Sequence, residues 1–110
     1  MMVFTTMTVW YPTGKSSEVA KKWVESLQKY PPDPSLVKTL AIGVKPTKDG
    51  IKVVVIGDIV KGKYEDALLR GVRSTHEFLS SIEGFRYEIE TFMDITEAMP
   101  IVGMEAPEER

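Results

Sequence analysis

The sequence contains no cysteine and no asparagine, and its single histidine is His76. Without cysteine, the chain can form no disulfide, thiolate metal site or cysteine nucleophile, so its stability must come from packing. One histidine excludes a multi-histidine metal site within one chain, and no motif predicts a metal or a cofactor. The absence of asparagine fits selection against thermolabile side chains in a heat-adapted organism, with chance composition as the alternative.

Strong net charge and long hydrophobic runs are also missing. The formal net charge is −2, from 14 basic and 16 acidic side chains, which gives no long-range attraction to nucleic acid or anionic lipid. No apolar run approaches the roughly 18 residues that a membrane span needs, and the first ten residues lack the pattern of a secretory signal. We therefore expect a cytoplasmic protein with neither a nucleic-acid nor a membrane partner.

The sequence has the size and composition of one folded domain, with 110 residues and a hydrophobic content of 43%. Period-two and period-3.6 patterns of apolar residues, separated by Pro and Gly, predict its elements. These are a strand at 3–11, a helix from 16 or 17 to about 30, a hairpin of strands at 37–44 and 51–60, a helix from 64 to 84 and a strand from 85 to about 95.

This order predicts a ferredoxin-like βαββαβ fold of the α+β class over residues 1–96. Its antiparallel sheet has the spatial order 4-1-3-2, with both helices on one face. The third strand carries Val53, Val54, Val55 and Ile56, so it is apolar on both faces, although the helices cover only one. A second copy packed on the open face would cover the other, which predicts a homodimer. The alternative is a monomer whose open face holds a ligand or another protein.

The C-terminal tail, residues 97–110, is too short to fold alone. It begins with an apolar stretch around Ile101 and Val102 and ends in glutamate-rich sequence. We expect its apolar part to pack on a partner subunit or across the open sheet edge, and the part from Glu105 onward to be disordered.

In element order and size, over nearly its whole length, the chain resembles the dimeric α+β barrel superfamily. In that superfamily two ferredoxin-like sheets pack face to face, and members include monooxygenases, isomerase-like enzymes and haem-binding proteins. The resemblance lies in the architecture and includes no specific motif. Haem-degrading members use an Asn, a Trp and a helical His, and because this chain has no Asn, that activity is not carried over.

Two glycine-containing loops suggest a site for a small anion. If the first and third strands run parallel, the loop with Lys15 and Ser16 lies at the same end of the sheet as the loop with Lys63. Two helix N-termini would then point their free N–H groups at one place. The structural alternative is that the serine caps a helix and the lysines are solvated.

Asp58 and His76 are the candidate proton-transfer residues. Asp58 interrupts the apolar third strand, at the end expected to lie near Trp10, Tyr11 and Tyr87, with Arg86 as a charge partner. His76 lies on the flank of the second helix. The structural alternatives are an aspartate at a frayed strand end and a solvent-exposed histidine.

The sequence is compatible with three functions. The first is a small-molecule-binding or sensing homodimer that takes an apolar or anionic ligand. The second is a cofactor-independent enzyme of the monooxygenase or isomerase type, with Trp10, Tyr11 and Tyr87 shaping its pocket. The third is a structural interaction subunit.

Overall fold

The computed structural model describes residues 3–105, which form a four-stranded sheet, two long helices and a short helical arm. The strands are β1 (Val3–Tyr11), β2 (Val37–Thr47), β3 (Gly50–Ile59) and β4 (Arg86–Met93). The helices are η1 (Thr13–Lys15), α1 (Ser16–Lys29), α2 (Tyr64–Phe78), α3 (Ile95–Ala98) and η2 (Met99–Val102).

The sheet has the order β2-β3-β1-β4, and every neighbouring pair is antiparallel. The predicted βαββαβ fold and strand order are therefore confirmed. The prediction that β1 and β3 run parallel was wrong: Val3 lies opposite Ile59, and Tyr11 lies opposite Ile51. The two strands joined by a crossover helix run parallel, so β1 and β2 have the same direction. The hairpin makes β3 antiparallel to β2, and β3 is therefore antiparallel to β1 as well.

The second helix ends earlier than predicted, at Phe78 rather than at Gly84. The Ser80 hydroxyl donates to the carbonyl oxygen of His76 at 2.5 Å, and serine side chains that bond nearby backbone compete with helical hydrogen bonding. A turn follows, and Gly84 adopts a φ of 80° before Phe85 leads into β4.

The β2–β3 hairpin is longer than predicted because Thr47 pairs with Gly50 across a two-residue turn. β2 is an edge strand that contains Pro46, and edge positions tolerate the missing N–H of proline. A bulge interrupts its pairing between Thr39 and Ala41. The final strand is shorter than predicted and ends at Met93.

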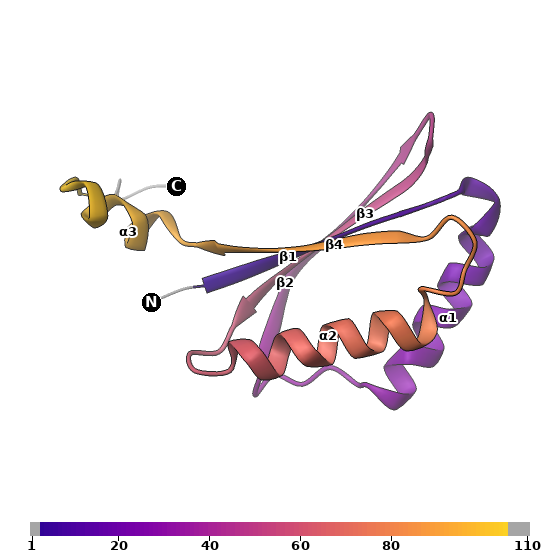
Figure 1. Cartoon of the computed structure of the whole chain (residues 1–110), viewed down its shortest axis with the longest axis horizontal. Helices are drawn as coiled ribbons and strands as arrows, with labels where there is room; N and C mark the ends of the chain where they lie inside the picture. Colours follow the sequence, from indigo (N-terminus) through magenta and orange to yellow (C-terminus); the bar gives the residue numbers. More distant parts are fainter. Residues whose placement is uncertain (1–2, 106–110) are drawn as a thin grey trace.

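Both long helices lie on one face of the sheet, as Figure 1 shows, and the buried core lies between that face and the helices. Five apolar residues form its centre: Val9, Val19, Leu79, Ile82 and Phe85. No side chain described in the structure is fully buried. The radius of gyration is 15.8 Å, against about 13 Å expected for a compact domain of this length, so the layers are thin and parts of the chain protrude.

The chain beyond β4 forms a helical arm, residues 94–104, made of α3 and η2. In Figure 1 it extends away from both long helices, at the end of the sheet where the N-terminus lies. Of the segment predicted to be disordered, only Glu105 belongs to the described range; residues 106–110 lie outside it. Within residues 3–105, none of the helices combines the length and apolar character needed to cross a membrane.

Candidate functional site

The main candidate site is an apolar cavity of about 440 Å³ between the helices and the sheet, which we call the helix-side cavity. Its size falls within the range typical of small-molecule pockets. α1, α2, residues of the segments that follow these helices, and the helix-facing residues of β1, β2 and β3 supply the walls. The lining residues are Met7, Val9, Tyr11, Val19, Ala20, Trp23, Ser26, Leu27, Tyr30, Ile42, Val44, Val53, Val55, Ser74, Thr75, Leu79 and Phe85.

None of these lining side chains carries a charge, and most of their hydroxyl groups are already in use within the protein. The hydroxyls donate from Ser26 to Trp23 O (2.6 Å), from Tyr30 to Glu77 Oε2 (2.7 Å), from Ser74 to Gly71 O (3.1 Å) and from Thr75 to Met7 Sδ (3.7 Å). Hydrogen bonds formed inside the chain leave a ligand little polar surface to recognise. The cavity therefore suits an uncharged, apolar molecule.

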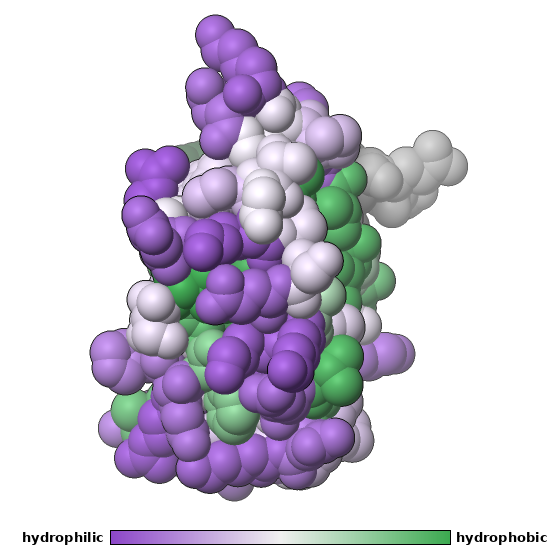
Figure 2. Space-filling view, turned by 90° about the vertical axis from the view of Figure 1, so that its right-hand side faces the viewer, coloured by the Kyte–Doolittle hydropathy of each residue, from purple (hydrophilic) through white to green (hydrophobic). Residues whose placement is uncertain are grey.

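The cavity is open along β2, where apolar side chains remain exposed. Ile42 is 51% exposed and Val44 is 65% exposed, while Trp23 of α1 is 47% exposed. Figure 2, which views the end of the molecule where α1 lies, shows hydrophobic side chains in a gap between hydrophilic ones and along one margin. Exposed apolar side chains at a cavity mouth are typical of a binding groove.

The opposite, open face of the sheet carries the side chains that alternate with the helix-facing ones. These are Phe4, Thr6, Thr8 and Trp10 of β1, Lys38, Ala41, Gly43 and Lys45 of β2, Lys52, Val54, Ile56 and Asp58 of β3, and Arg86, Glu88, Glu90 and Phe92 of β4. Phe4 and Phe92 stack with ring centroids 5.4 Å apart.

Charge on this open face is divided between its two halves. The β2 and β3 half holds three lysines and one aspartate, whereas the β1 and β4 half holds two glutamates and one arginine. The first half is therefore net basic and the second net acidic.

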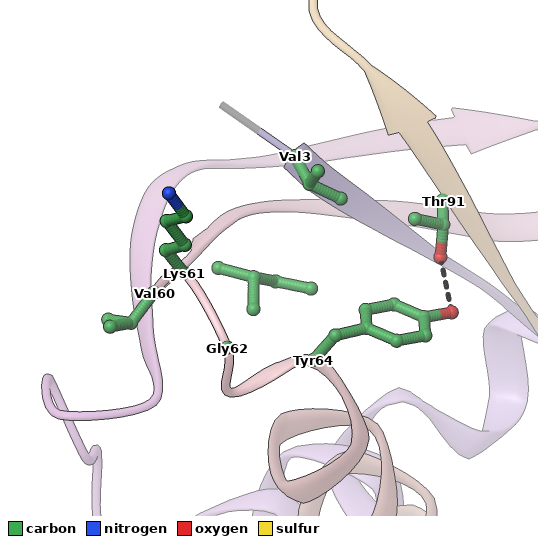
Figure 3. A pocket seen from close by; sticks show the side chains of 7 residues that line it. Val3, Val60, Lys61, Gly62, Tyr64 and Thr91 are labelled. Carbon is green, nitrogen blue, oxygen red and sulfur yellow. Dashed lines mark hydrogen bonds between the residues drawn. The ribbon is translucent and has the colours of Figure 1, made fainter. Parts of the chain in front are cut away.

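A smaller apolar hollow of about 340 Å³, the end hollow, lies where β1 begins and β3 ends. Figure 3 shows its walls, with the Tyr64 hydroxyl hydrogen-bonded to Thr91 Oγ1 at 2.7 Å. The lining residues are Val3, Ile59, Val60, Lys61, Gly62, Tyr64 and Thr91.

Asp58 lies at the opposite end of the sheet from its predicted neighbours. It pairs with Phe4 and Lys38 on the open face, whereas Trp10 pairs with Lys52 and Arg86. This prediction was wrong because it depended on the same mistaken strand direction. The Arg86 guanidinium instead lies over the Trp10 ring, 6.0 Å from its centroid.

His76 is exposed in the last turn of α2 and lines neither cavity. Its Nδ1 lies 3.4 Å from the Ser80 hydroxyl. The structure does not bring His76 and Asp58 together, because the histidine lies in the helical layer and the aspartate on the far face of the sheet. Among residues 3–105, no group of three potential metal ligands is found.

The two loops of the predicted anion site are at opposite ends of the sheet, so that prediction was wrong. Lys15 and Ser16 follow the end of β1, and Lys63 follows the end of β3, which the antiparallel register separates by the length of a strand. Lys15 lies 3.6 Å from Glu18, and the Ser16 hydroxyl donates to the carbonyl oxygen of Thr13.

The three predicted pocket aromatics separate between the two faces of the sheet. Tyr11 lines the helix-side cavity, and Tyr87 packs against the core beside Phe85, with ring centroids 6.3 Å apart. Trp10 is on the open face. Trp23, Ile42 and Val44 were missed: the sequence shows that they are apolar, but their exposure depends on how far α1 stands from β2.

Glu77 joins the two long helices on their outer side. Its carboxylate accepts hydrogen bonds from the Lys29 ammonium and from the Tyr30 hydroxyl, at 2.7 Å for the hydroxyl. Both hydrogen bonds lower the pKa of Glu77, and the bond from Lys29 has the larger effect. The Tyr30 ring packs edge-on against Phe78, so this network holds one wall of the cavity in place.

Comparison with known proteins supports the fold alone. No family model matches the chain, and no curated protein matches it. Among solved structures, the de novo designed protein Foldit4 superposes with a TM-score of 0.58 at 14% identity, over 86% of this chain and 99% of that one.

Two further structures have lower TM-scores. The C-terminal domain of the MgtC protein from Mycobacterium tuberculosis has a TM-score of 0.44 at 9% identity, over 82% of this chain and 88% of that one. Aminopeptidase PepT from Bacillus cereus has 0.43 at 10% identity, over 96% of this chain and 37% of that one. The strand order and the superposition on Foldit4 together support a ferredoxin-like α+β fold for this chain.

Proposed function

We propose that this protein binds a small, uncharged, apolar molecule in the helix-side cavity. The observation that carries the proposal is the lining of that cavity, which is apolar, uncharged and open to solvent along β2. A charged ligand would lose its hydration there without gaining a partner. The enzymatic alternative has less support, because Asp58 and His76 do not face the cavity.

Two dyes that differ by one charge test this proposal. N-phenyl-1-naphthylamine is neutral, and 1-anilinonaphthalene-8-sulfonate has the same aromatic frame with a sulfonate. We expect the neutral dye to bind at least about tenfold more tightly, because the cavity offers no partner for the sulfonate. Equal affinity for the two dyes would contradict the assignment.

A matched pair of variants locates the binding site. Val55 faces the cavity and its neighbour Val54 faces the open side of the sheet. Val55→Phe should fill the cavity and abolish binding of the neutral dye, whereas Val54→Phe should leave it unchanged. Energy transfer to the dye from Trp23, in a Trp10→Phe background, gives a second readout. Loss of binding in both variants would place the dye elsewhere.

We propose in addition that the protein acts as a homodimer, with a second copy covering the open face. Support comes from Val54, Ile56 and the stacked Phe4 and Phe92, which lie on the face of the sheet opposite α1 and α2. Face-to-face packing would bury these side chains.

Light scattering at micromolar concentration tests the dimer. The wild-type chain should have twice the monomer mass, and Ile56→Asp should be monomeric because it places a charge at the centre of the interface. Ile42→Asp, at an exposed apolar residue on the other face, is the control that should remain dimeric. A monomeric wild-type protein would rule out this part of the proposal while leaving the dye test independent.

A further inference from the structure

Two polar side-chain groups on the walls of the helix-side cavity have no hydrogen-bond partner within residues 3–105. They are the hydroxyl of Tyr11 and the indole N–H of Trp23. The other hydroxyls of the lining donate to groups of the protein itself. An indole N–H can only donate a hydrogen bond, whereas a phenol hydroxyl can donate or accept one. A hydrogen-bond acceptor is therefore the ligand group that can pair with either of them.

The Tyr11 hydroxyl is accessible, although the residue lies deep in the fold. Every fully buried side-chain polar atom within the described range has a partner, and the Tyr11 hydroxyl has none, so water or a ligand can reach it. Tyr11 faces the helices and lines the cavity together with Met7 and Val9 of the same strand. It is the last residue of β1 and pairs with Ile51, so it marks the end of the cavity nearest the β2–β3 turn.

The two unpartnered groups differ in their access to water. Trp23 stands at the mouth of the cavity and is 47% exposed, so water can still reach it when a ligand enters. Tyr11 is half-buried and packs against the core formed by Val9, Phe85 and their neighbours. A ligand that fills the cavity removes the water that reaches such a side chain. The hydroxyl of Tyr11 is therefore the group that needs a partner on the ligand.

A ligand that covers the Tyr11 hydroxyl without pairing with it binds less tightly. A tyrosine hydroxyl usually has a hydrogen-bond partner when it is buried, because an unpaired polar group loses its hydration. A wholly apolar ligand imposes that loss, whereas an acceptor placed beside the hydroxyl avoids it. A charged acceptor would lose more hydration than one hydroxyl can replace. The cavity therefore favours an uncharged acceptor on an otherwise apolar frame.

We propose that the ligand of the helix-side cavity is an apolar molecule with one uncharged hydrogen-bond acceptor, such as a ketone oxygen. Tyr11 selects this ligand by donating its hydroxyl hydrogen to that oxygen. The inference rests on the binding function proposed above and names the class of ligand for the same cavity. Tyr11 is the specificity-determining residue, and the rest of the lining supplies apolar contact.

Two ligands of the same shape test this proposal. 2-Acetylnaphthalene has a ketone oxygen where 2-isopropenylnaphthalene has a methylene group. Their dissociation constants are measured by displacement of N-phenyl-1-naphthylamine from the wild-type chain and from Tyr11→Phe. We expect Tyr11→Phe to weaken binding of the ketone at least about threefold, because it removes one hydrogen bond. Binding of the alkene should be unchanged or slightly stronger.

Tyr87→Phe is the matched control. Tyr87 also packs against the core from the neighbouring strand, but it does not line the cavity, so loss of its hydroxyl should change neither constant. Unchanged affinity of Tyr11→Phe for the naphthylamine dye shows that the variant keeps an intact cavity. Trp23→Phe should leave the ratio of the two dissociation constants as it is in wild type.

The outcomes separate this inference from the binding function. If the dye and both naphthalenes bind, but the ratio of their constants is the same in wild type and Tyr11→Phe, the inference is wrong and the binding function stands. If the ratio changes in Trp23→Phe instead, the indole binds the acceptor and the assignment of Tyr11 is overturned. If none of the three compounds binds the wild-type chain, both proposals are wrong.

The infrared spectrum of bound 2-acetylnaphthalene gives a second measurement that does not depend on affinity. A hydrogen bond to a ketone oxygen lowers the stretching frequency of the carbonyl group. This frequency should therefore be lower in the complex with the wild-type chain than in the complex with Tyr11→Phe, and Tyr87→Phe should match wild type. Equal frequencies in the wild-type and Tyr11→Phe complexes would contradict the proposal.

Discussion

The helix-facing side of the sheet has a packed region and a hollow region, and they differ although both are apolar. Val9, Leu79 and Phe85 line the cavity but are each less than 10% exposed, and Ile82, which does not line it, is 3% exposed. On β2 of the same face, Ile42 is 51% exposed. The hydrophobicity of a strand therefore does not decide its burial. The two crossovers set the positions of α1 and α2, and β2 lies at the sheet edge beyond their cover.

The comparison predicts its largest effect in the packed region. Ile82 is 3% exposed, so Ile82→Ala leaves a space among well-packed neighbours and should lower the free energy of unfolding by about 2–5 kcal/mol. Urea unfolding followed by circular dichroism measures the change. A loss below about 1 kcal/mol would mean that the region around Ile82 is packed no more tightly than the region around Ile42.

A smaller effect is expected at the turn that holds β2 in place. Gly50 has a φ of 134°, and a Cβ added there would lie 2.5 Å from the carbonyl oxygen of Tyr11. Gly50→Ala should cost about 1–3 kcal/mol of stability, measured by thermal unfolding. At Gly43 the added Cβ would meet nothing within 4 Å, so Gly43→Ala is the matched control. Equal losses of stability at both positions would contradict the prediction that the backbone conformation at Gly50 requires glycine.

The hollow region predicts a third, near-zero effect on stability. Ile42→Ala should change the free energy of unfolding by no more than about 0.5 kcal/mol, because half of the side chain is already in water. The same substitution should weaken binding of the neutral naphthylamine dye, since Ile42 lines the cavity. A large loss of stability with unchanged dye affinity would show that this region is part of the core and not a binding site.

The smallest effect is expected at Glu77, on the outer side of the helices. Because hydrogen bonds from Lys29 and Tyr30 lower the pKa of this carboxyl group in the folded protein, they contribute stability above its ordinary pKa of 4.5. That contribution is lost as the pH falls through the lowered value. Glu77→Gln should therefore be slightly less stable than wild type at pH 7 and equally stable at about pH 2. A difference that does not change with pH would contradict this role.

Much of the fold could be predicted from the sequence, because each element has a local pattern. Alternating residues from Val3 to Tyr11 identified β1 with its correct bounds, and the apolar stripe starting at Tyr64 identified α2. The predicted position of Asp58 was wrong because it assumed that β1 and β3 run parallel. The order of the elements already implies that these two strands are antiparallel. Correct strand directions would have placed Asp58 at the end of the sheet where β1 begins, which is where Phe4 lies.

The cavity could not be predicted from the sequence, because it depends on spacing between layers. The apolar stripe of α1 includes Trp23, and a stripe of this kind usually packs into a core. Here the helix stands away from β2, and Trp23 becomes a cavity wall that is 47% exposed. Local patterns report which face of an element is apolar, whereas the distance between two apolar faces depends on all the side chains between them.

The irregular edge formed by β2 has a consequence for behaviour at high concentration. The bulge between Thr39 and Ala41, together with Pro46, interrupts the row of backbone groups that another strand would need for pairing. At the other edge, Glu88 and Glu90 of β4 would repel an identical strand. Neither edge is a template for open-ended growth. Concentrated solutions should therefore stay free of fibrils that grow by pairing of strands edge to edge.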